Sequence, residues 1–563
     1  MPRLRSAVAL GLAAAAGLSL TLAARERPSS STAAAQLGVA DVLYREAEYR
    51  AAMRVYLQAA AVADVALRDR AREGAIRGAL RIGEFAVAST HAAALRAARP
   101  GDPTALTLSG DALWASGLFD ESEAAYREVQ AIAPGHAASL AGLAKALASR
   151  SRLVEARQAA EASLAAAPSP EGWHALAQIL ERERDYPGSA DALTRFIELL
   201  PPRERAGRSR WTMGQVHFLR SFRGRVPYEQ VSERGLTHTL PFQLVDDKVI
   251  VRGKANGSRM DFAVDTGAEQ AVLSVGAARK LGVRPLSYTI SAGVGQFGLR
   301  GLQLGMLDRF EVGTLKLRNV PVLIKNPALR DNPSDDVESF SPLAFGLSAV
   351  VDYGRRMLVL SEALPEEAAD FELPLRMHRL ATVRGEVNGR PKSFIVDTGG
   401  EVISLNTTTA RGLFRPIERQ RIGLRVHGAS GWDPEAYLLP GVNLDFDEIE
   451  YRNTPVVVLN LKMPSALLGY DIGGIVGHKF LGKYRVALDL PRSVVRLHRL
   501  PGRPQHRSGS VHEVTKSRSP QSREVKSGSP ASGSHAGAAP QPARLRTPRL
   551  RGLDPVDLAT SWT

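Results

Sequence analysis

Two nearly identical segments, 132 residues apart, constrain the fold of this chain more than any other feature of its sequence. Aligning residues 251–269 with residues 383–401 gives 11 identities in 19 positions. Each copy has an Asn-Gly pair between two apolar runs, which is a strong signal for a β-hairpin. The second run of each copy then leads through Phe-x-Val into Asp-Thr-Gly. The sequence therefore predicts a duplicated β domain with one aspartate in each copy, where a buried strand becomes a loop.

This context resembles the pepsin and retropepsin superfamily of aspartic proteases, most closely the bacterial retropepsin-like lobes. The resemblance implies two lobes that share one cleft, with one Asp-Thr-Gly loop from each. It implies that the catalytic carboxylates are Asp265 and Asp397, that the loops are cross-linked by the hydroxyls of Thr266 and Thr398, and that Gly267 and Gly399 let the backbone pass close to the carboxylates. Two carboxylates about 3 Å apart share one proton, so such a pair can activate water without a metal or another cofactor.

A second element of the resemblance is an apolar-apolar-glycine run that braces each aspartate loop. In the second lobe this run is Ile475, Val476 and Gly477. In the first lobe two alignments remain open. Gly346 lies 81 residues after Asp265, whereas a gapless alignment back from Asp352 puts Phe340 at the glycine position. The first lobe is thus expected to be a trimmed partner of the second.

Two glycine-rich segments are expected to form flaps over the cleft. Residues 293–298, with Gly293, Gly295 and Gly298, match the dinucleotide-binding pattern G-x-G-x-x-G, but strand-like sequence follows where that motif needs a helix. We therefore interpret this segment as a hairpin rather than a nucleotide site. Residues 427–432, with Gly428 and Trp432, stand at the matching place in the second lobe.

The N-terminal third has a 34-residue period that resembles the tetratricopeptide (TPR) repeat, a helix pair of this length. Proline recurs at 100, 134, 168 and 202, and small residues recur at 88, 122, 156 and 190. Gly83 and Phe85 recur as Gly117 and Phe119, where a tight turn precedes a packed aromatic ring. In the last repeat, residues 185 and 187 are aspartate and proline at these two positions. About five repeats are expected, and such solenoids usually bind protein partners.

Composition limits the other function classes. The chain has no cysteine, which excludes disulfides and thiolate chemistry, and it contains neither H-E-x-x-H nor G-x-S-x-G. Ten basic and four acidic residues give the segment 502–563 a charge of +6 out of a total of +15. This segment is too polar to form a core, so we interpret it as a solvated tail rather than a nucleic-acid-binding arm.

The first residues are typical of an export signal, with a basic start followed by an uncharged apolar run. We therefore expect a periplasmic or secreted protein with no stable membrane span after signal removal. The expected fold is multidomain, an α-helical TPR-like solenoid followed by a bilobal, mostly-β acid-protease fold. The expected order is a signal peptide (1–24), helical repeats (37–202), a linker (203–239), lobe 1 (240–362), lobe 2 (374–500) and a disordered basic tail (502–563).

These observations predict an exported aspartic endopeptidase that takes a peptide or protein substrate, with repeats that recruit a protein partner. A rival hypothesis is a peptide-binding scaffold in which degenerate lobes have lost turnover. A third hypothesis is that the lobes serve oligomerisation only. We expect the two lobes to pair within one chain and the β region to fold independently of the repeats.

Overall fold

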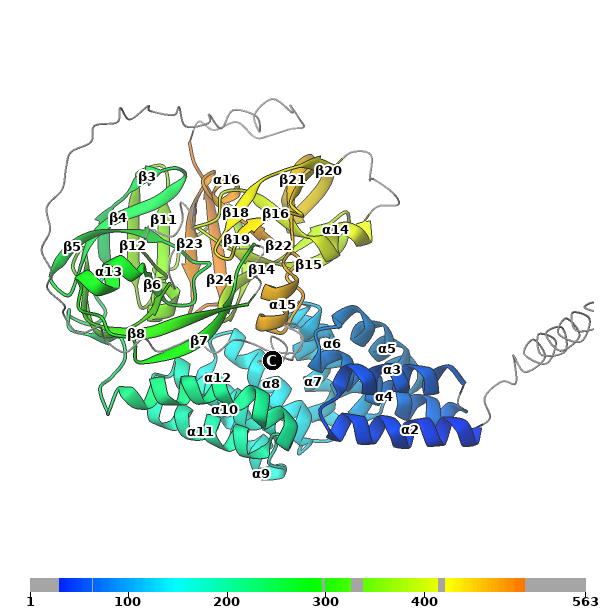
Figure 1. Cartoon of the computed structure of the whole chain (residues 1–563). Helices are drawn as coiled ribbons and strands as arrows, with labels where there is room; N and C mark the ends of the chain where they lie inside the picture. Colours follow the sequence, from blue (N-terminus) through cyan, green and yellow to red (C-terminus); the bar gives the residue numbers. More distant parts are fainter. Residues whose placement is uncertain (1–29, 63, 296–298, 326–337, 414–420, 502–563) are drawn as a thin grey trace, which may run out of the picture.

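The computed structural model describes residues 30–62, 64–295, 299–325, 338–413 and 421–501. The proposed signal peptide and basic tail lie outside the described residues. Figure 1 shows a helical region below two β lobes, so the predicted combination of a helical solenoid and a bilobal β fold is confirmed. Among the described residues, no helix is both long and apolar enough to cross a bilayer.

The solenoid consists of antiparallel helix pairs, and one further helix follows them. The helices are α2 (Ser30–Arg45), α3 (Tyr49–Val62), α4 (Val65–Arg81), α5 (Phe85–Ala98), α6 (Pro103–Ala115), α7 (Phe119–Ile132), α8 (Ala137–Ser149), α9 (Leu153–Ala166), α10 (Pro170–Arg182), α11 (Tyr186–Leu199) and α12 (Pro202–Ser221). Glycines allow neighbouring pairs to pack closely. A Cβ at Gly110 or Gly142 would lie 2.6 or 2.3 Å from the ring of Tyr126, which fits between α6 and α8.

The last repeat differs from the sequence-based alignment by one residue. Gly83 and Gly117 occupy the left-handed turn between the helices of their pairs, as expected. In the last pair this conformation belongs to Arg184 (φ 67°), and the buried aromatic residue that begins the next helix is Tyr186. The assignment to residues 185 and 187 was wrong because the connection between α9 and α10 spans residues 167–169, one fewer than the connection at 133–136.

The predicted linker at 203–239 is also corrected. Most of it is helix α12, and strands β1 (Glu229–Gln230) and β2 (His238–Pro241) then join sheets of the lobes. Helix α12 is ordered by packing, because Val216, Phe218 and Phe222 are buried against the last helix pair and lobe 1. The solenoid thus continues into the β region without a free connection.

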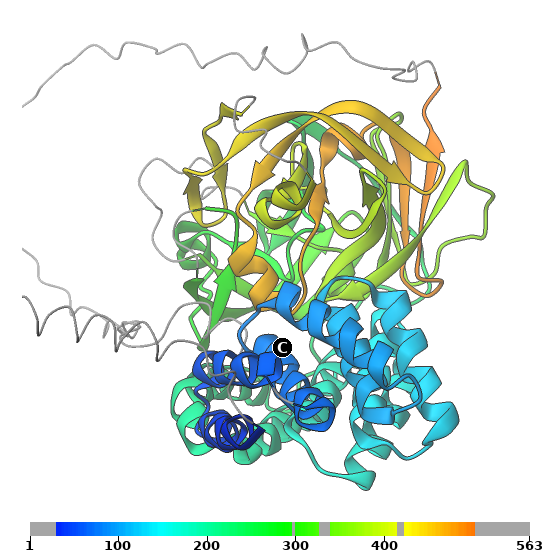
Figure 2. The ribbon, with the colours of Figure 1, turned by 90° about the vertical axis from the view of Figure 1, so that its right-hand side faces the viewer.

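The two ends of the solenoid approach each other. The hydroxyl of Tyr49 donates to Glu204 Oε2 of α12 (2.5 Å), and Arg203 pairs with Glu48 (2.6 Å). Figure 2 shows the first helices, in dark blue, beside the last ones, in teal. The superhelix therefore curls round so that its first and last units are in contact.

Lobe 1 is built on one sheet with the strand order β1-β9-β6-β10-β5-β4-β8-β7, and β3 also pairs with β4. Its strands are β3 (Gln243–Val245), β4 (Lys248–Ala255), β5 (Ser258–Val264), β6 (Ala271–Leu273), β7 (Ser287–Ala292), β8 (Leu299–Val312), β9 (Leu315–Ile324) and β10 (Ser339–Phe340), and helix α13 (Val275–Lys280) follows β6. Asn256 and Gly257 both have positive φ, which gives the tight β4–β5 turn that their sequence predicts.

Lobe 2 repeats this plan. Its strands are β14 (Leu380–Val387), β15 (Arg390–Val396), β16 (Ile403–Asn406), β17 (Ile422–Gly423), β18 (Val426–Gly428), β19 (Gly431–Asp433), β20 (Tyr437–Phe446), β21 (Ile449–Leu459) and β22 (Gly474–Val476), and its helices are α14 (Thr407–Leu413), α15 (Lys462–Leu468) and α16 (His478–Leu481). Asn388 and Gly389 form the turn that corresponds to the one in lobe 1.

An antiparallel sheet joins the lobes along their back. Its order is β2-β12-β11-β23-β24-β13, from β11 (Ser348–Asp352), β12 (Met357–Ser361), β13 (Phe371–His378), β23 (Tyr484–Asp489) and β24 (Val494–Arg499). The lobes meet where β11 of lobe 1 pairs with β23 of lobe 2, for example Ala349 with Leu488. Because hydrogen bonds run continuously across this boundary, the two lobes of one chain have a fixed relation to each other.

The solenoid also packs directly on both lobes. Trp114 packs edge-to-face on His378 of lobe 2, and Phe119 packs edge-to-face on Tyr470, with ring centroids 5.0 Å apart in both pairs. On lobe 1, the Arg184 guanidinium donates to the carbonyl of Phe345 (2.6 Å). The helical region is therefore a fixed wall beside the lobes.

Candidate active site

The two predicted aspartates end equivalent strands. Strands β5 and β15 each lie beside a short parallel strand, β10 and β22 respectively. The amide of Asp265 donates to the carbonyl of Phe340 (2.9 Å), and the amide of Asp397 donates to the carbonyl of Val476 (3.1 Å). The strand periodicity and the Asp-Thr-Gly turn thus bring each carboxylate to the same kind of strand end, half-buried and facing the other lobe.

These pairings decide between the two alignments of the loop-bracing run. Ile475 and Val476 lie beside β15, and Gly477 follows them, as predicted. A Cβ at Gly477 would be 2.6 Å from the carbonyl oxygen of Gly400, so this close approach requires glycine. In lobe 1 the equivalent of Val476 is Phe340, and Ser341 follows at the glycine position.

The assignment of Gly346 to loop bracing was therefore wrong. Gly346 ends a 3-10 turn at Leu343–Phe345 in the left-handed conformation (φ 72°), beyond the strand that contacts the aspartate loop. The gapless alignment was closer. It put Phe340 at the glycine position, which Ser341, the next residue, occupies in the structure.

The two threonines cross-link the loops reciprocally. The Thr266 hydroxyl donates to the Val396 carbonyl (2.7 Å) and accepts the amide of Thr398 (3.0 Å). In the same way, the Thr398 hydroxyl donates to the Val264 carbonyl (2.7 Å) and accepts the amide of Thr266 (3.1 Å). Both side chains are buried. Four hydrogen bonds between the lobes thus fix the separation of the loops.

Each glycine of the motif lies against the carboxylate of the other lobe. A Cβ at Gly267 would be 2.5 Å from Cγ of Asp397, and a Cβ at Gly399 would be 2.7 Å from Oδ1 of Asp265. The carboxylates also accept backbone amides. Gly267 donates to Asp265 Oδ1 (3.0 Å), whereas Gly399 (2.8 Å) and Gly400 (3.0 Å) both donate to Asp397 Oδ1.

These contacts set the protonation of the pair. Burial, followed by the nearby charge of Asp397, raises the pKa of Asp265 from 3.8 to about 7. Burial also raises the pKa of Asp397, but backbone amides and a hydrogen bond from Asp265 oppose the rise. With two amide donors on Asp397 and one on Asp265, the shared proton is favoured on Asp265. Near neutral pH, one carboxylic acid and one carboxylate therefore lie side by side.

The pair opens into a cavity of about 1720 Å³ between the lobes and the solenoid. The two predicted flap segments meet over it. The amide of Gly293, at the end of β7, donates to the hydroxyl of Ser430 (3.1 Å), and the amide of Ser430 donates to the carbonyl of Val294 (2.9 Å). Gly295 and Gly428 allow this contact, since a Cβ at either would lie 2.3–2.4 Å from the other hairpin.

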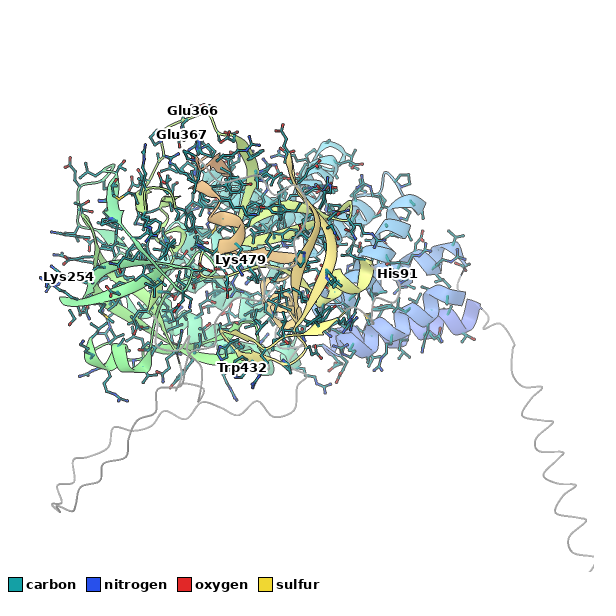
Figure 3. The ribbon with its side chains drawn as sticks, turned by 90° about the horizontal axis from the view of Figure 1, so that it is seen from above. His91, Lys254, Glu366, Glu367, Trp432 and Lys479 are labelled. Carbon is teal, nitrogen blue, oxygen red and sulfur yellow. The ribbon has the colours of Figure 1, made fainter. Side chains whose placement is uncertain are left out.

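The remaining predicted flap residues have different places. Trp432, at the edge of the molecule in Figure 3, packs on His427 with ring centroids 4.6 Å apart, and the Arg425 guanidinium lies 5.0 Å from its ring centroid. It stabilises the β18–β19 hairpin, while residues 428–430 face the cavity. Gly298 lies outside the described residues.

Sequence reasoning missed several residues that line the cavity. Glu269, four residues after Asp265, receives two hydrogen bonds from Arg379 of lobe 2 (2.9 and 3.0 Å). Glu181 and Gln215, from α10 and α12, also line the cavity. The repeated glutamate after each Asp-Thr-Gly signalled Glu269, but no local signal could place the solenoid residues there. Among the described residues, no group of three or more metal-ligating side chains occurs.

Comparison with solved structures found helical-repeat proteins and an aspartic proteinase among the similar chains. A solved TPR protein of Thermus thermophilus has 17% identity and a TM-score of 0.27, and it covers 30% of this chain and 92% of its own. MamA of Desulfovibrio magneticus has 18% identity and a TM-score of 0.23, covering 30% and 94%. An aspartic proteinase of Irpex lacteus has 11% identity and a TM-score of 0.31, covering 47% and 98%.

No curated protein matches the chain. A family model described as aspartyl protease matches residues 251–337 and 383–472. These two segments contain the two Asp-Thr-Gly loops, so the parts of the chain that are similar to the aspartyl protease family are those that supply the two carboxylates.

Proposed function

We propose that this chain is an active aspartic endopeptidase in which Asp265 and Asp397 form one catalytic pair. The observation that carries the proposal is the reciprocal arrangement of the loops. Each carboxylate lies against the Asp-Thr-Gly glycine of the other lobe, and four threonine hydrogen bonds hold the two loops together. Such a paired site needs both lobes, which gives the duplication a chemical purpose.

The chemistry follows from the unequal carboxylates. Asp397, the ionised member, accepts a proton from a water molecule, and the water oxygen bonds to the carbonyl carbon of the substrate. Asp265, the protonated member, donates to the carbonyl oxygen as negative charge develops on it. Proton transfer to the amide nitrogen from Asp397 then lets the C–N bond break, and Asp265 recovers its proton as the carboxylic acid product forms. The sum is peptide plus water giving an acid and an amine.

The substrate class follows from the cavity. An extended peptide can pair its backbone with the free edges of the glycine-rich hairpins, while its side chains occupy pockets between the lobes. The two hairpins meet above the catalytic pair at residues 293–294 and 428–430. They would have to separate to admit such a peptide, or close over it once it is bound. We propose that these hairpins act as flaps.

We also propose export of the protein and a protein-binding role for the solenoid. The basic and apolar start of the chain supports export. The solenoid carries exposed apolar residues such as Val39, Val42 and Val65, which could contact a partner. The turns between the helices of the last three pairs already contact the lobes, so a partner would bind other faces of the helices.

The alternative function is a peptide-binding scaffold without turnover. Two observations favour it, and the first is that Ser341 occupies the position of the bracing glycine in lobe 1. The second is that, among the described residues, one backbone amide donates to the carboxylate of Asp265, whereas two donate to that of Asp397. A scaffold of this kind would bind peptides in the cleft and release them uncut.

A peptide library separates these two functions. The purified protein is incubated with peptides of diverse sequence from acidic to neutral pH, and products are identified by mass spectrometry. The proposed peptidase gives new termini, and their rate of appearance decreases when an inhibitor of the pepstatin type is added. Bound but uncut peptides at every pH, with protein that is folded by circular dichroism, would support the scaffold.

A further inference from the structure

The cavity that contains the catalytic pair extends as far as the solenoid. Besides both lobes, it is lined by residues of α8, α10 and α12, including Lys145, Gln178, Glu181 and Gln215. These helices are fixed in place, so they form a permanent wall at one end of the cleft.

Contacts on both lobes seal this end. On lobe 1, Arg184 donates to the Phe345 carbonyl (2.6 Å), and the Ser287 hydroxyl donates to the carbonyl of Gly214 in α12 (2.5 Å). On lobe 2, Arg182 donates to the Met377 carbonyl (3.3 Å), and the Ser493 hydroxyl donates to the carbonyl of Arg150 (2.6 Å). The solenoid thus bridges the two lobes across one end of the cleft.

The opposite end is open. It is lined by Asp247, Glu401 and Lys479, whose side chains are 48%, 60% and 47% exposed. Figure 3, which looks at the molecule from the side opposite the solenoid, shows Lys479 near the centre of the lobes. At the closed end, the corresponding Glu269 and Arg379 are only 35% and 26% exposed.

One carboxylate at the closed end lacks a cationic partner within 4 Å among the described residues. Glu181 accepts a hydrogen bond from Gln215 Nε2 (2.9 Å) and forms no ion pair. Burial raises its pKa to about 7, and the charge of Glu269 adds to the rise, whereas Arg379 opposes it. Arg379 is already held by both oxygens of Glu269.

The other cationic side chains near this wall already interact with other groups. Arg182 donates to the carbonyls of Ala148 and Met377, and Arg184 donates to those of Tyr228 and Phe345. The Lys145 ammonium lies 4.5 Å from the centre of the Trp114 ring. A half-buried carboxylate with a neutral partner favours a cation that arrives from the cavity, since that cation would offset the cost of partly desolvating the charge.

We propose that the closed end of the cleft is a subsite for a positively charged group near one end of the substrate chain, with Glu181 as the residue that binds it. An extended substrate can leave the cleft only at the open end. The part of the substrate between the catalytic pair and the closed end must therefore be short. A free N-terminus would place its ammonium against Glu181. The proposal rests on the proposed peptidase function and adds that cleavage occurs near the N-terminus.

The test uses the full-length protein and one set of matched peptides. The set contains a cleavable peptide with a free N-terminus, the same peptide with an acetylated N-terminus, the acetylated peptide with lysine at each of its first positions, and a version with an amidated C-terminus. Products are located by mass spectrometry and kcat/KM is measured for each. We expect cuts within a few residues of the N-terminus and a loss of about tenfold or more on acetylation, the size of one charge-assisted contact.

Glu181→Gln tests the residue itself. It should raise KM for the free-ended peptide about tenfold with little change in kcat, and it should abolish the preference over the acetylated peptide. Glu198→Gln changes an exposed glutamate of the neighbouring helix α11, which pairs with Arg195, and should change neither value. Recovery of cleavage when lysine is added to an acetylated peptide would assign the bound cation to a side chain rather than to the terminal ammonium.

Three results would overturn the proposal while leaving the peptidase function intact: cuts at internal positions independent of either end, equal kcat/KM for free and acetylated peptides, or sensitivity to amidation of the C-terminus instead. If no peptide is cut, the peptidase function fails first. The subsite is then decided by fluorescence anisotropy of C-terminally labelled peptides, where equal affinity for the free and acetylated forms would refute it.

Discussion

Two glycines, one on each aspartate loop, determine how closely the carboxylates can approach the opposite lobe. A Cβ added to Gly267 would lie 2.5–2.7 Å from all three atoms of the Asp397 carboxyl group. Atoms cannot remain this close, so the carboxyl group or the loop would have to move. Because each glycine contacts the carboxylate of the other lobe, a change in one loop disturbs the residue that the other loop presents.

Gly267→Ala should therefore lower peptide hydrolysis by at least about 100-fold, since small displacements of catalytic groups have effects of this size. The protein should remain folded. Gly276→Ala is the matched control, because a Cβ there meets only Ser274 Oγ at 3.9 Å in helix α13. It should leave kcat/KM unchanged and stabilise the helix slightly. Full activity in the Gly267 variant would show that the loops are less tightly apposed than the structure indicates.

The raised pKa of Asp265 predicts how activity depends on pH. Hydrolysis should decrease as pH rises through about 7, because Asp265 then loses the proton that it donates to the carbonyl oxygen. This decrease is measured by the dependence of kcat/KM on pH. A profile that stays flat to pH 9 would contradict the assignment of Asp265 as the protonated member.

The same shift predicts a stability effect with a defined sign. The folded pKa lies above the ordinary value of 3.8, so the folded protein holds this proton more tightly than the unfolded chain. The contribution of Asp265 to the free energy of unfolding is fully present below pH 4 and is lost as pH rises through about 7. Urea unfolding across this pH range should show a larger loss in the wild type than in Asp265→Asn, because the variant keeps Glu181 and Asp397, whose pKa values are also raised.

At the scale of elements, the duplicated strand-to-loop units were predictable from the sequence, and their differences were not. The Asn-Gly hairpins and the Asp-Thr-Gly loops follow from local residue preferences, so both copies could be found without a structure. The bracing strand of lobe 1 could not, because β10 has two residues where β22 has three, and Phe340 and Ser341 replace valine and glycine. Such a short parallel strand has no periodicity of its own and forms only beside β5.

Helix α12 and the turn of the last repeat also could not be predicted from local sequence alone. The apolar residues of α12 are compatible with a helix or a loop, and they are ordered as a helix by packing on the last helix pair and on Leu304 of β8. Glu181 could not be assigned to the cleft for a related reason. Its sequence position is typical of a solvated helix face, and only the docking of the solenoid on the lobes brings it to the cavity.

The threonine cross-link predicts a stability effect at the scale of the two loops. Thr266→Val removes a hydroxyl that makes two hydrogen bonds, and it leaves the Val396 carbonyl and the Thr398 amide without these partners. We expect a loss of about 1–3 kcal/mol in the free energy of unfolding, measured in urea. Thr454→Val, at a surface strand, should change it by less than about 0.5 kcal/mol. Equal values for the two variants would mean that the cross-link contributes nothing measurable.

At the scale of the whole molecule, the solenoid and the lobes form one structural unit. Phe119 packs on Tyr470, which is fully buried, Trp114 packs on His378, and helix α12 contacts β7 through Gly214 and Ser287. The expectation that the β region folds alone after a cut between residues 202 and 240 is therefore revised. Such a fragment would expose Tyr470 and Ile472, both buried in the intact chain.

One ion pair across this interface gives a test. Asp120 of α7 pairs with Arg150 (3.0 Å) and with Arg376 of lobe 2, whose side chain is only 7% exposed. Asp120→Ala should lower the free energy of unfolding by about 1–3 kcal/mol, because it leaves a buried guanidinium without its carboxylate. Glu128→Ala, which breaks an exposed pair on the same helix, should cost less than about 1 kcal/mol.

Thermal unfolding should show a single transition, and its midpoint temperature should be lower in the Asp120 variant than in the wild type. Two separate transitions, of which only the helical one shifts, would mean that the solenoid and the lobes unfold independently. Because β11 and β23 pair across the lobes within one chain, both loops of the site should also belong to the same chain.

The most direct test of this account is peptide hydrolysis by Asp265→Asn and Asp397→Asn, each alone and then mixed in equal amounts. We predict that each variant loses activity by about 100- to 10,000-fold and that mixing restores none, because both carboxylates of the only pair come from one chain. Asp261→Asn, an exposed aspartate earlier in β5, is the control and should keep full activity. Substantial activity in either catalytic variant, or its recovery on mixing, would contradict a single catalytic pair built within one chain.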